Sequence, residues 1–553
     1  MSSPAESNPK PTPGLLRRAA RLLRPSHQHS AFSATLLLMS AIMLSRVIGY
    51  VREAYIAWAF GAGLQTDAYV AAFTLPDWLN YVVAGGTASI TFISIFTRYL
   101  SEKREDEAQK AFSVVITVMT AVLAIGIGLA EVFTRDIEKY MFPHFRPEQM
   151  DLCVYLTRIL LPAQLFFYVG GVVSAVLMSR RMFLFPAMGP LLYNVFIILG
   201  GVALSGRMGI ASLAVGAVAG GIIGPFLVNA IGAARSGMGY RPSFDLRHPA
   251  FIEWVKLSIP LMLGVSLVTA DEWILRYFAS GGAGDITRLN YAKRLFAVPI
   301  AVLGQATGQA SLPFFARLFG EKRMADFAQT VNAAVYRVSA ASFLATAWMV
   351  AAALPVVDLV YRRGRFHFSD SQETSVFFFW FSLSLALWAA QGLYARAFYA
   401  AGDTLTPMIA GTVITVVSLP IYAALFHAYS VVGLAIASDL GILANTLAMF
   451  LLLHWRKLVP ATGMRWGELG KALGTAVFAA VVSYSVARLV PVHGSRKADV
   501  ISLALVSLTW AAAVAVGLRL TRSELPEALR RRRQPEVVPE PAADGYTREL
   551  QEP

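Results

Sequence analysis

The chain has 553 residues, of which 56% are hydrophobic and only 15% are charged. This composition excludes an ordinary soluble globule and is typical of a membrane protein built from many helices. The formal net charge of +14 could indicate nucleic acid as a partner. However, the basic residues cluster beside apolar stretches, so we exclude nucleic acid and attribute the charge to contact with anionic membrane lipids.

Long apolar stretches recur along the chain and predict an all-α polytopic membrane protein with about fourteen transmembrane helices. Each stretch is long enough to cross a bilayer at 1.5 Å per residue. A basic N-terminal tail (1–30) precedes them, and a C-terminal tail (520–553), expected to be disordered, follows. The expected spans are 31–60, 67–99, 109–133, 151–178, 183–205, 209–233, 250–280, 289–318, 327–358, 374–400, 406–427, 430–454, 468–490 and 499–519.

The first expected span carries charge where a bilayer tolerates it poorly. Arg46 falls near its middle, and Arg52 and Glu53 follow closer to its end. A charge at that depth costs at least ~2.5–3.5 kcal/mol, so it must face a bundle interior or a water-filled cavity. A guanidinium in such a cavity suits a phosphate, because its planar fork donates two parallel hydrogen bonds. The structural alternative is an Arg46–Glu53 ion pair, two helical turns apart on one face.

An internal repeat relates two basic loops. Residues 96–109 (FTRYLSEKREDEAQ) resemble residues 315–329 (FARLFGEKRMADFAQ), at an offset of 219 positions over most of their length. Each copy follows an even-numbered span, so the repeats are parallel, although chance similarity of two cytoplasmic loops is the alternative. Parallel repeats predict two six-helix lobes, 31–233 and 250–454, around a central cavity, with two additional helices in 468–519.

The same plan places the first helices of the second lobe opposite Arg46. Glu272 and Arg276 lie four residues apart, and they could simply pair with each other. Lys293 and Arg294 are adjacent, so at most one of them can point fully into the cavity, and we expect it to be Arg294.

Basic residues also indicate how the chain crosses the membrane. They gather before the first span, after the last one and in alternate loops, which predicts that both termini are cytoplasmic. The loops around Arg146 and Arg362 weaken this bias without reversing it. The chain has no nucleophile, metalloprotease or nucleotide-binding motif and a single cysteine, Cys153, so we predict no enzyme, no cofactor and no metal site.

Several segments resemble the MurJ (MviN) family of lipid II flippases, in the multidrug/oligosaccharidyl-lipid/polysaccharide exporter superfamily. The segments LSRVIGYVREA and RAFYAAGDTLTP are the most specific. The resemblance extends over most of the expected spans. The matching segments are 44–54, 60–76, 161–194, 291–299 and 396–407.

The resemblance implies a function in peptidoglycan biosynthesis, and hence in cell wall biogenesis and cell shape. Lipid II, an undecaprenyl-pyrophosphate-linked disaccharide-pentapeptide, would move from the inner to the outer leaflet of the bacterial cytoplasmic (inner) membrane. Cell-wall synthesis proteins are possible partners. By motif, the family's cavity arginines fall on Arg46, Arg52 and Arg294, and its aspartate of the T-D-A sequence falls on Asp67.

The chain departs from the family pattern in places that bear on substrate. Where the family has two arginines in the second span, this chain has Asn80 and Tyr81, and we expect the Asn80 amide to donate to a phosphate oxygen. Lys293 stands in place of an aspartate, and the eleventh span has no acidic residue, which disfavours a sodium site. The alternatives are a flippase for another polyprenyl-linked oligosaccharide, a cation-coupled drug antiporter and, least favoured, a non-transporting membrane scaffold.

Overall fold

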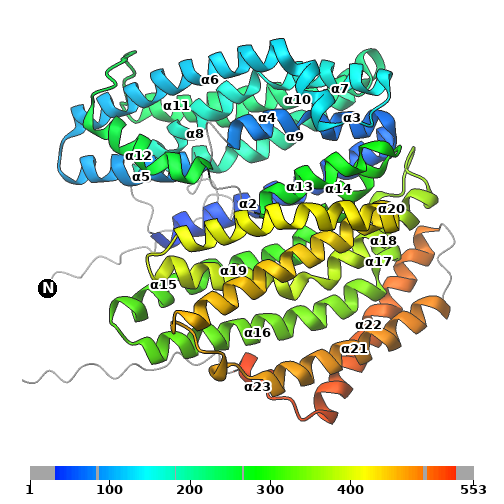
Figure 1. Cartoon of the computed structure of the whole chain (residues 1–553). Coiled ribbons are helices and arrows are strands. Elements are labelled where there is room, and N and C mark those ends of the chain that lie inside the picture. The colour runs from blue at the N-terminus through cyan, green and yellow to red at the C-terminus, as the bar shows by residue number, and fades with distance from the viewer. Residues whose placement is uncertain (1–30, 82–85, 181, 264–266, 490–494, 531–553) are drawn as a thin grey trace, which may run out of the picture.

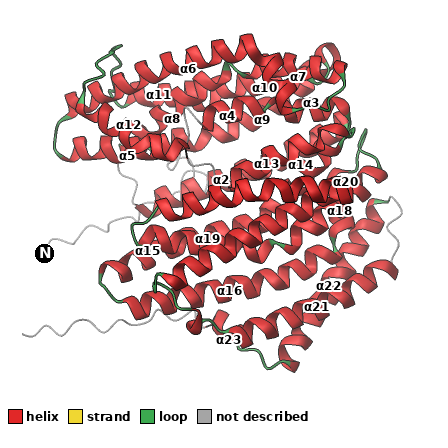
Figure 2. Ribbon diagram, in the orientation of Figure 1, coloured by secondary structure: helices red, strands yellow, loops and turns green. Residues whose placement is uncertain are grey.

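Helices make up the structure. The computed structural model describes residues 31–81, 86–180, 182–263, 267–489 and 495–530, and the described part contains helices joined by short loops and no strand (Figure 2). The predicted all-α class is therefore confirmed. The tail expected at 1–30 lies outside the described residues, as does the tail expected at 520–553 beyond residue 530. Within the described part of that tail the expectation of disorder is wrong, because Leu525–Arg530 form a short helix.

The first half of the chain forms a run of helices that begins with a thirty-residue helix, α2. Its members are α2 (Ala31–Phe60), α3 (Leu64–Ala72), α4 (Thr74–Leu79), α5 (Gly86–Ser101), α6 (Glu105–Met141), α7 (Pro147–Leu160), α8 (Ala163–Ser179), α9 (Leu184–Met208), α10 (Ala211–Gly221), η2 (Ile222–Val228), α11 (Asn229–Arg235) and α12 (Pro249–Leu263).

The second half continues in the same way. Its members are α13 (Leu267–Phe278), η3 (Ala279–Gly281), α14 (Asp285–Pro299), η4 (Ile300–Ala306), α15 (Thr307–Gly320), α16 (Met324–Ala351), α17 (Ala353–Tyr361), α18 (Phe368–Leu383), α19 (Leu385–Ala400), α20 (Leu405–Trp455), η5 (Ala461–Gly463), α21 (Trp466–Leu489), α22 (Arg496–Leu520) and α23 (Leu525–Arg530).

The helices are long and apolar enough for a membrane. Within the described residues nine helices could cross one, or ten if the bent pair α18–α19 is a single span. The number fourteen stays a prediction. Two of the expected spans, 406–427 and 430–454, run together in α20, whose backbone turns at Ser430, where φ is 52°.

Two groups of helices lie face to face (Figure 1). Helices α3 to α12 form the N-terminal bundle, and α13 to α23 form the C-terminal bundle. Between them runs α2, which packs against α9 of the first bundle and α17 of the second. Each bundle has an apolar core of its own, and a further core cluster reaches across both.

The seventh expected span is divided between the bundles. Its first half, α12, packs on α5 and α6, where Phe251 and Trp254 join the N-terminal core. Its second half, α13, packs on α20 of the C-terminal bundle. The second lobe is expected to begin at residue 250, whereas α12 packs with the N-terminal bundle and only α13 packs with the C-terminal bundle.

Candidate functional site

A cavity of about 680 Å³ lies between the bundles. Side chains from α2, α4, α9, α13, α14 and η4 line it, and α18, α19 and α20 close it from the C-terminal side. Its ionisable lining consists mostly of five basic and three acidic side chains: Arg46, Arg52, Arg276, Lys293 and Arg294 against Glu53, Asp77 and Glu272. Such a surface favours an anionic ligand.

Arg52, Glu53 and Arg294 form the centre of this lining. Arg52 forms an ion pair with Glu53 and donates a hydrogen bond of 2.8 Å to Asn194 Oδ1 on α9. From the other bundle, Arg294 Nε lies 3.8 Å from Glu53 Oε1. Glu53 is buried, whereas 46% of the Arg294 side chain is exposed. One carboxylate therefore holds a guanidinium group of its own helix, α2, and one of the C-terminal bundle, and the more exposed of the two, Arg294, keeps donors free for a ligand.

Arg46 precedes Arg52 on α2, and its side chain is exposed to the cavity. Its Nη2 donates a hydrogen bond of 3.2 Å to Gln305 Oε1 on η4 of the opposite bundle. The structural alternative, an Arg46–Glu53 pair, is not formed, because Glu53 pairs with Arg52 and Arg294 instead. The charge of Arg46 is thus available to a ligand.

The two adjacent basic residues of α14 behave differently. Both line the cavity, but the Lys293 ammonium turns to Asp271, a buried carboxylate that also accepts a hydrogen bond from Tyr422. Arg294 turns toward Glu53 in the cavity. Of the two, Arg294 has the more exposed side chain, 46% against 18% for Lys293.

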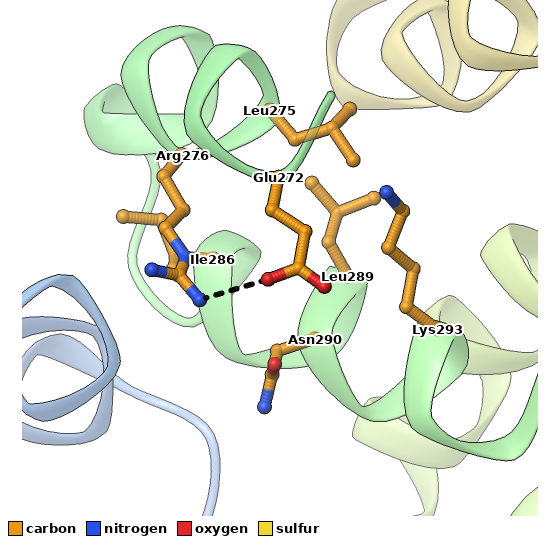
Figure 3. Close-up of a pocket in the computed structure, with 7 residues that line it drawn as sticks. All are labelled: Glu272, Leu275, Arg276, Ile286, Leu289, Asn290 and Lys293. Atoms are coloured by element: carbon orange, nitrogen blue, oxygen red, sulfur yellow. Dashed lines mark hydrogen bonds and ion pairs between the residues drawn. The ribbon is translucent and has the colours of Figure 1, made fainter. Parts of the chain in front are cut away.

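A small bay opens from the cavity between α13 and α14 (Figure 3). Within it Arg276 Nη2 lies 3.4 Å from Glu272 Oε2, so the alternative that these two residues pair with each other is the arrangement in the structure. We call it the α13–α14 bay. Its lining residues are Glu272, Leu275, Arg276, Ile286, Leu289, Asn290 and Lys293.

Asp67, predicted to bind substrate, does not line the cavity. It is fully buried on α3 and accepts hydrogen bonds from Gly284 N (2.5 Å), Thr287 N (2.8 Å) and Thr287 Oγ1 (2.6 Å). It thereby caps the first turn of α14 from the opposite bundle, where free N–H groups need an acceptor. The structure gives Asp67 a role in holding the bundles together.

Further contacts join the bundles near Asp67. Arg365 N donates a hydrogen bond of 3.0 Å to Trp58 O, and His144 Nδ1 lies 3.3 Å from Ser280 Oγ. Gly364, with φ of 57°, lies so close to Trp58 that a Cβ there would be 2.2 Å from its carbonyl oxygen. We call this the Asp67 end of the molecule and the opposite one, where α5 ends, the Arg98 end.

Asn80 also lies outside the cavity lining. It follows α4, half-buried, and its neighbour on that helix, Asp77, lines the cavity instead. The predicted residues Arg46, Arg52 and Arg294 are therefore brought together around one space, while Asp67 and Asn80 are not part of it. The described residues contain no group of three or more histidine, cysteine or acidic side chains that could hold a metal ion.

Comparison with known proteins identifies the family. The family model "Lipid II flippase MurJ" matches residues 56–502. The chain belongs to the MurJ family. It is 28% identical over 441 residues to the lipid II flippase MurJ of Burkholderia cenocepacia, covering 77% of this chain and 84% of that protein. It is 25% identical to the probable lipid II flippase MurJ of Synechocystis, covering 80% of this chain and 85% of the relative.

Solved structures show the same fold. A lipid II flippase MurJ in an inward closed conformation superposes with a TM-score of 0.74 at 22% identity, covering 88% of this chain and 99% of that one. An inward-facing multidrug resistance transporter of the MATE family superposes with a TM-score of 0.61 at 14% identity, covering 76% and 97%. The MurJ-family chain thus has the architecture of a membrane transporter.

Sequence reasoning missed several polar residues of this MurJ-family cavity. Asn194 and Gln305 accept hydrogen bonds from the two arginines of α2. Both are uncharged amides in apolar surroundings, and no sequence motif distinguishes them. Asp77 was visible as a carboxylate in an apolar stretch. The signal that could have identified it is its position inside an apolar segment, because burying a charged group there costs free energy, as it does for Arg46.

Proposed function

We propose that this chain transports lipid II from the inner to the outer leaflet of the bacterial cytoplasmic membrane by alternating access. The observation that carries the proposal is the convergence of Arg46, Arg52 and Arg294 on one cavity between two bundles. Guanidinium groups pair with phosphate oxygens through two parallel hydrogen bonds, so this cluster suits a pyrophosphate. The chain is a transporter in this proposal and performs no catalysis.

The orientation follows from the distribution of basic residues. Arg98 and the loops with the repeated basic motif would be cytoplasmic, with both termini on the same side. The Asp67 end would then be periplasmic, and the contacts of Asp67 and Trp58 would close the cavity toward the periplasm. Release to the outer leaflet would require these contacts to break while contacts form at the Arg98 end.

The lipid chain would lie elsewhere. A second space of about 1,020 Å³ lies between the C-terminal bundle helices α16 to α18 and the final pair α21 and α22. It is lined mainly by apolar side chains, among them Leu354, Phe368, Phe379 and Trp380. Such a surface suits a polyprenyl chain, because the transfer of apolar surface from water to an apolar environment is favourable.

The proposal can be tested in cells whose own lipid II flippase is depleted and replaced by this chain. Cells depleted of their own lipid II flippase would express this chain, and the lipid II exposed on the outer leaflet would be measured by cleavage with an enzyme that cannot cross the membrane. We expect the chain to restore exposure and Arg46→Ala to fail at equal protein abundance. Unchanged exposure with the wild-type chain correctly inserted would contradict the proposal.

A further inference from the structure

The α13–α14 bay has a polar rim and an apolar floor. Leu275, Ile286 and Leu289 form the floor, and each is buried. The free volume is about 20 Å³, which is the size of a single water-sized group. The bay opens to the main cavity, because Glu272, Arg276, Asn290 and Lys293 line both spaces.

The rim still has unused hydrogen-bonding capacity. Arg276 Nη1 donates to Thr74 Oγ1 at 2.9 Å, and its Nη2 reaches only Glu272, so the remaining N–H groups are open. The Glu272 side chain is half exposed, which leaves its second oxygen as an acceptor. Among the described residues, no partner holds the Asn290 amide, which can both donate and accept. Lys293 is the exception, since its ammonium is held by Asp271.

The bay has an apolar floor with room for one small group, and its rim has a hydrogen-bond donor and a hydrogen-bond acceptor. These features fit a ligand group that is small and apolar at one end and both accepts and donates hydrogen bonds beside it. We propose that the bay binds a secondary amide that carries a methyl group. The methyl would lie on Leu275 and Leu289, the carbonyl would accept from Asn290, and the N–H would donate to Glu272. The acetamido group of an N-acetylated amino sugar has this chemistry, and so has an alanyl residue of a peptide. This inference rests on the proposed function, since it names what the transported headgroup carries.

The position of the bay relative to Arg294 agrees with the sugar as the source. Asn290 and Arg294 are four residues apart on α14, so they share a face of the helix and lie ~6 Å apart along its axis. A pyrophosphate held by Arg52 and Arg294 would therefore place the sugar bonded directly to it beside the bay. A hexose without the acetamido group would leave the apolar floor empty and the Asn290 amide unpartnered.

Binding to the purified full-length chain in lipid nanodiscs tests the inference. The probes are undecaprenyl pyrophosphate alone, undecaprenyl pyrophosphate linked to N-acetylglucosamine, and the same lipid linked to glucose. We expect the wild type to bind the N-acetylglucosamine form about tenfold more tightly than the glucose form, because the 2-hydroxyl of glucose can replace one of the two hydrogen bonds but neither the other nor the methyl contact. Asn290→Ala and Glu272→Ala should both remove that difference, and the uncharged change Asn290→Ala should leave the affinity for undecaprenyl pyrophosphate alone within twofold of the wild type.

Control measurements distinguish a failure of this inference from a failure of the proposed function. Ser438→Ala changes a cavity residue outside the bay and should keep the tenfold difference. Equal wild-type affinity for the two sugar lipids would overturn the sugar as the source, and a fourth probe, the glucose lipid bearing an alanyl amide, tests the peptide. If that probe also binds no more tightly than the glucose lipid, or if the bay variants weaken all probes equally, the inference is wrong. A wild type that binds none of the pyrophosphate lipids would instead contradict the proposed function.

Discussion

Asp67 and Arg46 are both charged residues that lie between the two bundles, but their side chains have opposite surroundings. Asp67 is fully buried, and its two oxygens accept three hydrogen bonds from the start of α14. Arg46 is exposed in the cavity and has one hydrogen bond, to Gln305. The protein itself satisfies the first charge, whereas it leaves most donors of the second one open.

This difference separates two uses of a charge in a membrane protein. A charge whose hydrogen bonds are all made inside the protein fixes one arrangement of helices, and its removal should cost stability. A charge left open in a cavity contributes little to stability, and its removal should cost ligand binding. Arg52 combines the two uses, because it supports buried Glu53 and also lines the cavity.

Arg52→Ala should have the largest effect. Removing one partner of a buried ion pair costs ~3–5 kcal/mol, because the other charge stays buried without its partner. We expect transport in reconstituted liposomes to fall by about a hundredfold or more and the protein to lose thermal stability. The double variant Arg52→Ala/Glu53→Ala should recover stability without recovering transport. If the double variant transports normally, Arg52 does not contact the substrate.

Asp67→Ala should reduce stability by ~3 kcal/mol, since three hydrogen bonds to a carboxylate are lost together. The expected result is a lower midpoint of thermal unfolding in detergent, with the affinity for undecaprenyl pyrophosphate unchanged. Asp67→Asn keeps the shape and some of the acceptors, so it should lose less. A variant with normal stability and weakened lipid binding would return Asp67 to the substrate site that its sequence motif predicted.

Arg46→Ala should leave stability unchanged and weaken the binding of a pyrophosphate lipid tenfold to a hundredfold, which corresponds to the ~1.5–3 kcal/mol of a charged hydrogen bond. Arg46→Lys should restore little, because an ammonium cannot donate two parallel hydrogen bonds. Both variants need to be measured for abundance and for binding. Full rescue by lysine would exclude a bidentate phosphate contact at this position.

The sequence predicted the fold class and the central arginines for physical reasons. Apolar length indicates helices directly, and the cost of burying Arg46 points to a cavity whatever the fold. The position of Asp67 could not be derived, because a carboxylate that caps a helix and one that binds a ligand look the same in a sequence. The partners Asn194, Gln305 and Thr287 depend on contacts between helices far apart in the chain, which no local pattern reports.

The smallest effect is expected at the Arg98 end, where Arg98 and Glu253 join α5 to α12 through two hydrogen bonds of 2.8 and 2.5 Å. Both side chains are more than a third exposed, so water and salt weaken their attraction. Arg98→Ala should therefore lower the unfolding midpoint much less than Asp67→Ala, and the small loss should vanish at high salt. Arg135→Ala, which removes the exposed pair with Asp151 within one bundle, is the matched control. A loss at Arg98 as large as that at Asp67, and insensitive to salt, would mean that an exposed pair within the N-terminal bundle stabilises the protein as much as the buried contact of Asp67 between the bundles.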